Sequence, residues 1–90
     1  MAEVAIKLKV MPESLDTNLE EIQNKGKEKI EAEGGKINNF ETQEVAFGLK
    51  ALMVTISLDE DKGTDVAENV FSEIEGVSSV EIADYRRAFG

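Results

Sequence analysis

Two segments of the chain alternate between apolar and polar residues with the two-residue period of a half-buried β-strand. Their apolar positions are Val4, Ile6, Leu8 and Val10 in the first segment, and Leu52, Val54, Ile56 and Leu58 in the second. Residues 36–46 have the content of a strand but alternate poorly, which predicts an edge strand. Residues 77–85 predict a final strand, with Val80 and Ile82 facing inward.

A helical period follows the first strand. A helix with one apolar stripe is predicted for residues 17–33, and Gly34 and Gly35 are expected to end it. The stripe consists of Leu19, Ile22, Gly26 and Ile30. Thr17 is predicted to be the N-cap of this helix, with Glu20 completing a capping box. A glycine inside a helix costs about 1 kcal/mol, so Gly26 on the apolar stripe predicts that the helix closely approaches the sheet.

A second helix is predicted for residues 64–75, ended by Gly76. Its expected buried positions are Val66, Val70, Phe71 and Ile74. The resulting order, β-α-β-β-α-β, predicts an α+β domain of the ferredoxin-like class that spans residues 1–90. In this fold four antiparallel strands have the spatial order 4-1-3-2, and two helices cover one face. The other face is expected to be open and mixed in character, with Ala5, Lys7, Lys9, Ala51, Met53 and Thr55.

The composition excludes several classes of protein. The 19 acidic residues exceed the 10 basic ones, and the net charge of −9 opposes direct nucleic-acid binding, which needs a basic surface. The two acidic segments coincide with the predicted helices. No apolar run is long enough to span a membrane, and the N-terminus lacks the features of a signal peptide. The chain has no Cys and no His. We therefore expect a cytoplasmic protein without a disulfide.

The motifs of a cofactor or metal site are missing. No glycine stands where a phosphate-binding loop would need it before Lys27 or Lys36. The acidic turn at 59–63 lacks the glycine and glutamate positions of a calcium-binding loop, and it suits a solvated helix start. The serines have no histidine to activate them, and the loop after the first strand carries no cation. The sequence therefore predicts no cofactor, no metal and no covalent chemistry, and a hydrolase is improbable.

Two features of the sequence remain as candidates for binding a partner. The only arginines, Arg86 and Arg87, are adjacent near the C-terminus of an acidic chain, and their planar cations suit phosphates or carboxylates of a partner. They could equally pair with acidic side chains of the chain itself. The turn with Phe47, Gly48 and Lys50 could present an aromatic anchor beside a cation, or Phe47 could belong to the core.

The predicted topology separates these two features. The turn between strands two and three lies at one end of the sheet, and the end of strand four lies at the other. A strand of ten residues spans roughly 30 Å, so Phe47 and Arg87 could contact two sites of one large partner at once.

The sequence resembles the family of archaeal translation elongation factor 1-beta, and the exchange domain of its eukaryotic counterpart, over nearly the whole chain. The blocks that carry the resemblance are 47–52 (Phe-Gly-Leu-Lys-Ala-Leu), 16–21 (Asp-Thr-Asn-Leu-Glu-Glu), the acidic turn 59–61, and 77–83 (Val-Ser-Ser-Val-Glu-Ile-Ala). The resemblance implies a ferredoxin-like guanine nucleotide exchange factor for elongation factor 1-alpha in its GDP-bound form.

The resemblance also implies roles for both features. Phe47 matches the phenylalanine that docks on the second domain of the GTPase, in a turn that includes Gly48 and Lys50. Arg87 matches, without gaps, a lysine that enters the magnesium and phosphate region of the nucleotide domain. Here the cation is Arg and three residues follow it, so either Arg86 or Arg87 could be the inserting side chain.

A second interpretation stays open. The same fold serves as a small regulatory module that binds a ligand or a partner, typically as an oligomer that pairs sheet edges. The exchange-factor hypothesis instead predicts a monomer when the protein is free, so the mass in solution helps to distinguish the two.

Overall fold

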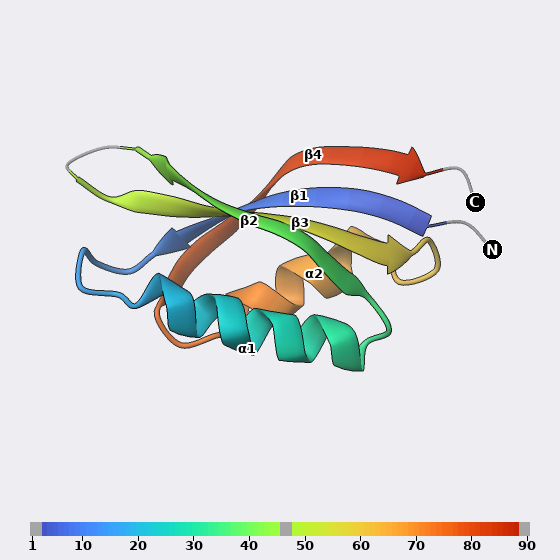
Figure 1. The fold of residues 1–90 in the computed structure, drawn as a ribbon, viewed down its shortest axis with the longest axis horizontal. Coiled ribbons are helices and arrows are strands. Elements are labelled where there is room, and N and C mark those ends of the chain that lie inside the picture. The colour runs from blue at the N-terminus through green and yellow to red at the C-terminus, as the bar shows by residue number, and fades with distance from the viewer. Residues whose placement is uncertain (1–2, 46–47, 89–90) are drawn as a thin grey trace.

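The computed structural model describes residues 3–45 and 48–88 and confirms the ferredoxin-like α+β fold. Its elements are β1 (Glu3–Pro12), α1 (Leu19–Ala32), β2 (Lys36–Glu44), β3 (Lys50–Asp59), α2 (Gly63–Ser72) and β4 (Val77–Ala88). The strands are antiparallel in the order β2-β3-β1-β4, which is the predicted order read from the other edge. Both helices lie against one face of the sheet (Figure 1).

The core lies between this face and the helices. The predicted apolar positions of β1 and β3 are all at most 1% exposed. From the helices, the core receives Ile22, Ile30, Ala67 and Phe71, and from the turn after α2 it receives Ile74. The two-residue period of the central strands therefore correctly predicts which side of the sheet is buried.

Gly26 does allow a close approach, but the predicted partner is wrong. A Cβ atom at Gly26 would lie 2.3 Å from Cε1 of Phe71, so at this position α1 closely approaches an aromatic ring of α2 and not the sheet. Phe71 is completely buried. The glycine makes room for a large side chain at the contact between the two helices.

The N-cap of α1 is Asn18 and not Thr17. The Asn18 side chain accepts hydrogen bonds from the backbone N–H groups of Glu20 and Glu21, at 3.0 and 3.3 Å. Thr17 is used in the preceding turn, where its hydroxyl accepts a hydrogen bond from the backbone N–H of Ser14 at 3.2 Å. Both residue types are good caps, and the turn decides between them.

α2 ends at Ser72, three residues before the predicted end. Ile74 follows in a turn and still packs in the core with 4% of its surface exposed. Ala67 is fully buried as well, whereas Val66 and Val70 only border the core.

β2 is an edge strand, as predicted, and a bulge explains its poor alternation. Ile37 pairs with Ile56 and Asn39 pairs with Thr55, so Asn38 is an extra residue. The Asn38 side-chain amide donates a 2.7 Å hydrogen bond to the hydroxyl of Ser57. The bulge lets Ile37 and Phe40, three positions apart, both pack against the core.

The open face of the sheet is less exposed than predicted. Ala51 is completely buried and Met53 is 9% exposed. Lys9 and Glu41 lie directly opposite Met53 on the two neighbouring strands. Their long aliphatic stems shield it from solvent.

The molecule is elongated along its strands, with extents of 42 × 21 × 18 Å. Within the part of the chain that the structure describes, neither helix has the length and apolar character needed to cross a membrane.

Candidate functional site

The two candidate features lie at opposite ends of the sheet. We call the end with Gly48 and Lys50 the hairpin end, and the end with Arg86 and Arg87 the tail end. β3 starts at Lys50, and its last residue, Asp59, pairs across the sheet with Glu3, which in turn pairs with the backbone of β4 at its end. Figure 1 shows the start of β3 and the end of β4 at opposite ends of the molecule. Phe47 lies outside the described residues.

At the hairpin end, a tight connection joins β2 to β3. The backbone N–H of Val45 donates a 2.9 Å hydrogen bond to the carbonyl of Leu49. Gly48 has a φ of 79°, a conformation that glycine adopts without steric cost. Lys50, the first residue of β3, is exposed. Lys50 therefore begins β3 directly after the backbone hydrogen bond between Val45 and Leu49, with its cation exposed.

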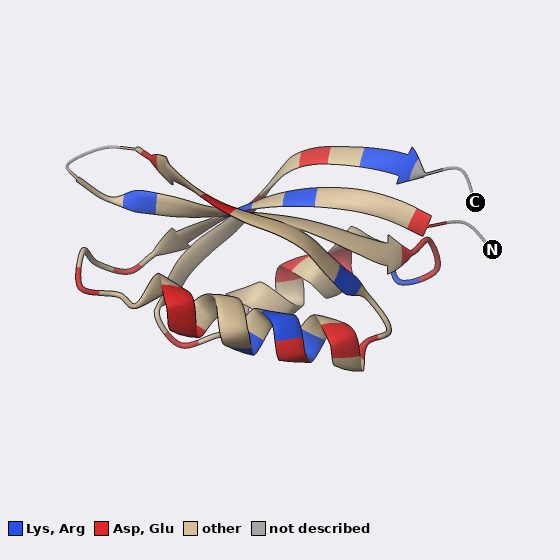
Figure 2. Ribbon diagram, in the orientation of Figure 1, with Lys and Arg blue, Asp and Glu red and all other residues tan. Residues whose placement is uncertain are grey.

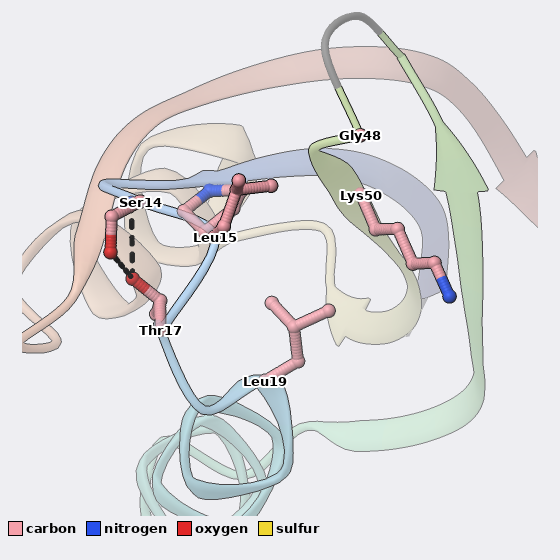
Figure 3. A pocket seen from close by; sticks show the side chains of 7 residues that line it. Ser14, Leu15, Thr17, Leu19, Gly48 and Lys50 are labelled. Carbon is pink, nitrogen blue, oxygen red and sulfur yellow. Dashed lines mark hydrogen bonds between the residues drawn. The ribbon is translucent and has the colours of Figure 1, made fainter.

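A cavity of about 220 Å³ lies between this hairpin and the turn that joins β1 to α1. The turn contributes Leu15, and α1 contributes Leu19 from its first residue (Figure 3). Gly48 and Lys50 line it from the hairpin side. Two of the predicted site residues therefore share a cavity with a turn that sequence reasoning did not select.

At the tail end, β4 continues through Ala88, three residues beyond the predicted end at Tyr85. β1 supplies the backbone partners as far as Glu3, which pairs with Ala88. Arg86 and Arg87 are therefore strand residues and not part of a frayed tail.

The two arginines lie on opposite faces of the sheet. Ile82 pairs with Leu8 and Asp84 with Lys7, so Ala83 is an extra residue in a bulge. Beyond it, Arg87 pairs with the buried Val4 and therefore lies on the helix-covered side, whereas Arg86 lies on the open face. Without the bulge, strict alternation from Ile82 would give the reverse assignment.

Both guanidinium groups pair with acids of the same chain. Arg86 Nε lies 3.2 Å from Asp84 Oδ2, and Arg87 Nη2 contacts Glu60 Oε1 in the turn after β3. The exposed side-chain fractions are 81% for Arg86 and 64% for Arg87, so both pairs are open to solvent. Figure 2 shows acidic segments around the basic end of β4, so this end carries both signs of charge.

Among residues 3–45 and 48–88, no group of three or more acidic side chains is placed to hold a metal ion. What the site offers is recognition chemistry: a turn with a cation at one end and two exposed guanidinium groups at the other.

Comparison with known proteins supports the family resemblance that the sequence shows. The sequence profile described as the EF-1 guanine nucleotide exchange domain matches residues 5–88. The chain belongs to this family. Proteins named elongation factor 1-beta from three archaea are similar over nearly their whole length. The protein of Methanosarcina barkeri is 43% identical over 88 residues, which cover 97% of this chain and 99% of the relative.

Two further archaeal relatives extend the comparison. Elongation factor 1-beta of Haloarcula marismortui is 45% identical over 83 residues, or 91% of this chain and 93% of the relative. That of Methanocella arvoryzae is 40% identical over 90 residues, or 99% and 100%. The resemblance to an exchange-factor family of translation elongation is therefore confirmed.

Sequence reasoning missed two neighbours of the EF-1 exchange domain's candidate residues. Glu60 was part of an acidic turn judged to be only a helix start, but the register of β3, β1 and β4 brings that turn beside the end of β4. Leu15 is an isolated leucine in a loop. Its only signal was that a large apolar residue is unusual among the polar residues of a turn.

Proposed function

We propose that this protein is a guanine nucleotide exchange factor that binds GDP-bound elongation factor 1-alpha, promotes release of GDP and so allows GTP to load. In this proposal residues 1–90 act as one exchange-factor domain, which is a monomer when free. The partner is a protein, with no direct contact to nucleic acid or membrane. The observation that carries the proposal, beyond family membership, is the placement of Lys50 and Arg87 at opposite ends of one continuous sheet.

The hairpin end is the docking end in this mechanism. Phe47 docks on the second domain of the GTPase, as the resemblance implies, and Gly48 gives the turn the backbone shape that presents it. Lys50 adds a cation that suits acidic groups of the partner. Because β3 begins at Lys50, the position of this end is fixed relative to the rest of the sheet.

The tail end acts on the nucleotide. Arg87 enters the magnesium and phosphate region of the GTPase, where GDP is held mostly by contacts to its phosphates. Arg86, on the other face, contacts the rim of that region. Arg87 must first leave Glu60, and an exposed ion pair of this kind contributes only about 0–1 kcal/mol. The ion pair with Glu60 therefore keeps the Arg87 guanidinium at the end of β4, but it does not prevent Arg87 from moving into the GTPase.

No covalent step is required. A guanidinium that competes with magnesium weakens GDP binding, while the hairpin end keeps its own contacts with the GTPase. Nucleotide and exchange factor then destabilise each other's complexes by thermodynamic linkage. Excess GTP refills the empty site, and the exchange factor dissociates.

The proposal is tested by stopped-flow release of fluorescently labelled GDP from elongation factor 1-alpha in the presence of excess unlabelled nucleotide. Adding this protein is expected to raise the release rate in a saturable manner, at substoichiometric concentrations as well. A rate that does not change with the concentration of this protein would refute the proposed function.

A further inference from the structure

The hairpin end carries an apolar side chain that the fold does not use. Leu15 is 67% exposed, the largest exposed fraction among the large apolar residues that the structure describes. It stands in the turn between β1 and α1, beside the hairpin. A Cβ atom added at Gly48 would lie 3.6 Å from Cδ2 of Leu15, so the two segments are neighbours at the rim of one cavity.

The turn that presents Leu15 is held by its own hydrogen bonds. The Ser14 and Thr17 hydroxyls lie 3.4 Å apart (Figure 3). The backbone N–H of Asp16 donates to the Ser14 hydroxyl at 3.2 Å. The backbone N–H of Glu13 donates to the carbonyl of Gly76 at 2.9 Å, which ties the turn to the start of β4. Because these hydrogen bonds already order the backbone of the turn, little backbone freedom is lost when a partner covers Leu15.

The cavity beside Leu15 is lined by apolar and uncharged polar residues and by one cation. Its lining consists of Pro12, Ser14, Leu15, Thr17, Leu19, Gly48 and Lys50. None of these is acidic, in a chain with 19 acidic residues, and the single charge is the cation of Lys50. The matching surface is therefore an apolar side chain next to a carboxylate.

We propose that the β1–α1 turn, through Leu15, is a second docking element for elongation factor 1-alpha, which inserts an apolar side chain between Leu15 and the base of the hairpin and places an acidic group near Lys50. This inference rests on the proposed function. It adds a contact beside the hairpin, so that the partner is bound by two segments of the hairpin end, the β1–α1 turn and the hairpin itself.

The test compares Leu15→Ala with the wild type. Binding to elongation factor 1-alpha is measured by titration calorimetry, and GDP release is measured as a function of exchange-factor concentration. Burial of one aliphatic side chain predicts that Leu15→Ala binds about tenfold more weakly. The maximal release rate at saturation stays unchanged because the tail end is intact. Leu15→Met, which keeps the apolar volume, is expected to restore most of the affinity.

Ile82→Ala is the matched control. Ile82 is an aliphatic residue on β4 with 38% exposure, away from both the cavity and the arginines, and its truncation should leave the dissociation constant unchanged. Equal affinity of Leu15→Ala and wild type, with exchange activity present, would overturn this inference alone. Absence of binding and exchange by the wild type would overturn the proposed function with it. A wild-type dimer in solution that Leu15→Ala abolishes would assign the surface to a second copy instead.

Discussion

Arg86 and Arg87 are neighbours in the sequence but face different surroundings, because the bulge at Ala83 places them on opposite sides of the sheet. Arg86 pairs with Asp84, two residues away on the same strand, and 81% of its side chain is exposed. Arg87 reaches Glu60 in a different segment of the chain. We therefore expect the two cations to have separable roles in the proposed exchange.

Single substitutions test this separation. Arg87→Ala is expected to lower the maximal rate of GDP release about 10- to 100-fold, the range for loss of one charge-assisted contact. Arg86→Ala, on the open face, should change it less than about threefold. Stopped-flow release at saturating exchange factor measures both. Because each side chain is exposed, the urea midpoints of both variants should equal that of the wild type. A larger loss from Arg86→Ala would reverse the assignment.

At the scale of the elements, the sequence predicts regular structure well and local interruptions poorly. Alternation in β1 and β3 correctly identifies the buried side of the sheet, and the helical stripe in α1 is correct. The bulges at Asn38 and Ala83 could not be predicted, because an extra residue is defined by the partner strand and not by its own strand.

The same limit applies to the candidate site. The pattern predicts that Lys50 and Arg87 lie at opposite ends, since this follows from element order alone. The contact of Arg87 with Glu60 joins segments that are far apart in the sequence. The same is true of the proximity of Leu15 to Gly48. No local pattern encodes them, and they depend on register and on how turns fold back over the sheet.

Gly26 provides a stability test of the contact between the helices. Gly26→Ala gains about 1 kcal/mol of helix propensity, but its Cβ would lie 2.3 Å from a ring atom of the buried Phe71. Overpacking of this kind costs about 1–3 kcal/mol. We expect a net loss of up to about 2 kcal/mol in the free energy of unfolding, measured by urea denaturation. In a Phe71→Leu background, where the ring is absent, the same alanine should be neutral or stabilising. Stabilisation by Gly26→Ala in the wild-type background would contradict the close contact.

At the scale of the whole molecule, the hairpin end and the tail end are connected by the central strands β1 and β3 and not by a flexible linker. Lys50 and Arg87 are separated by eight strand positions, roughly 25 Å. This distance exceeds the Debye length of about 8–10 Å at physiological ionic strength. The two cations therefore do not influence each other electrostatically, and each end is expected to contribute independently to exchange.

A double-mutant cycle on the rate of GDP release tests this independence. Lys50→Ala should raise the concentration for half-maximal release about threefold without changing the maximal rate, since an exposed charge at an interface affects mostly encounter. Arg87→Ala should lower the maximal rate, and in the double variant the two free-energy changes should add within about 0.5 kcal/mol. Leu15→Ala combined with Lys50→Ala is the internal comparison, because both residues line one cavity and should couple. Strong coupling between Lys50 and Arg87, equal to that between Leu15 and Lys50, would mean that the two ends are not independent contacts on a rigid sheet.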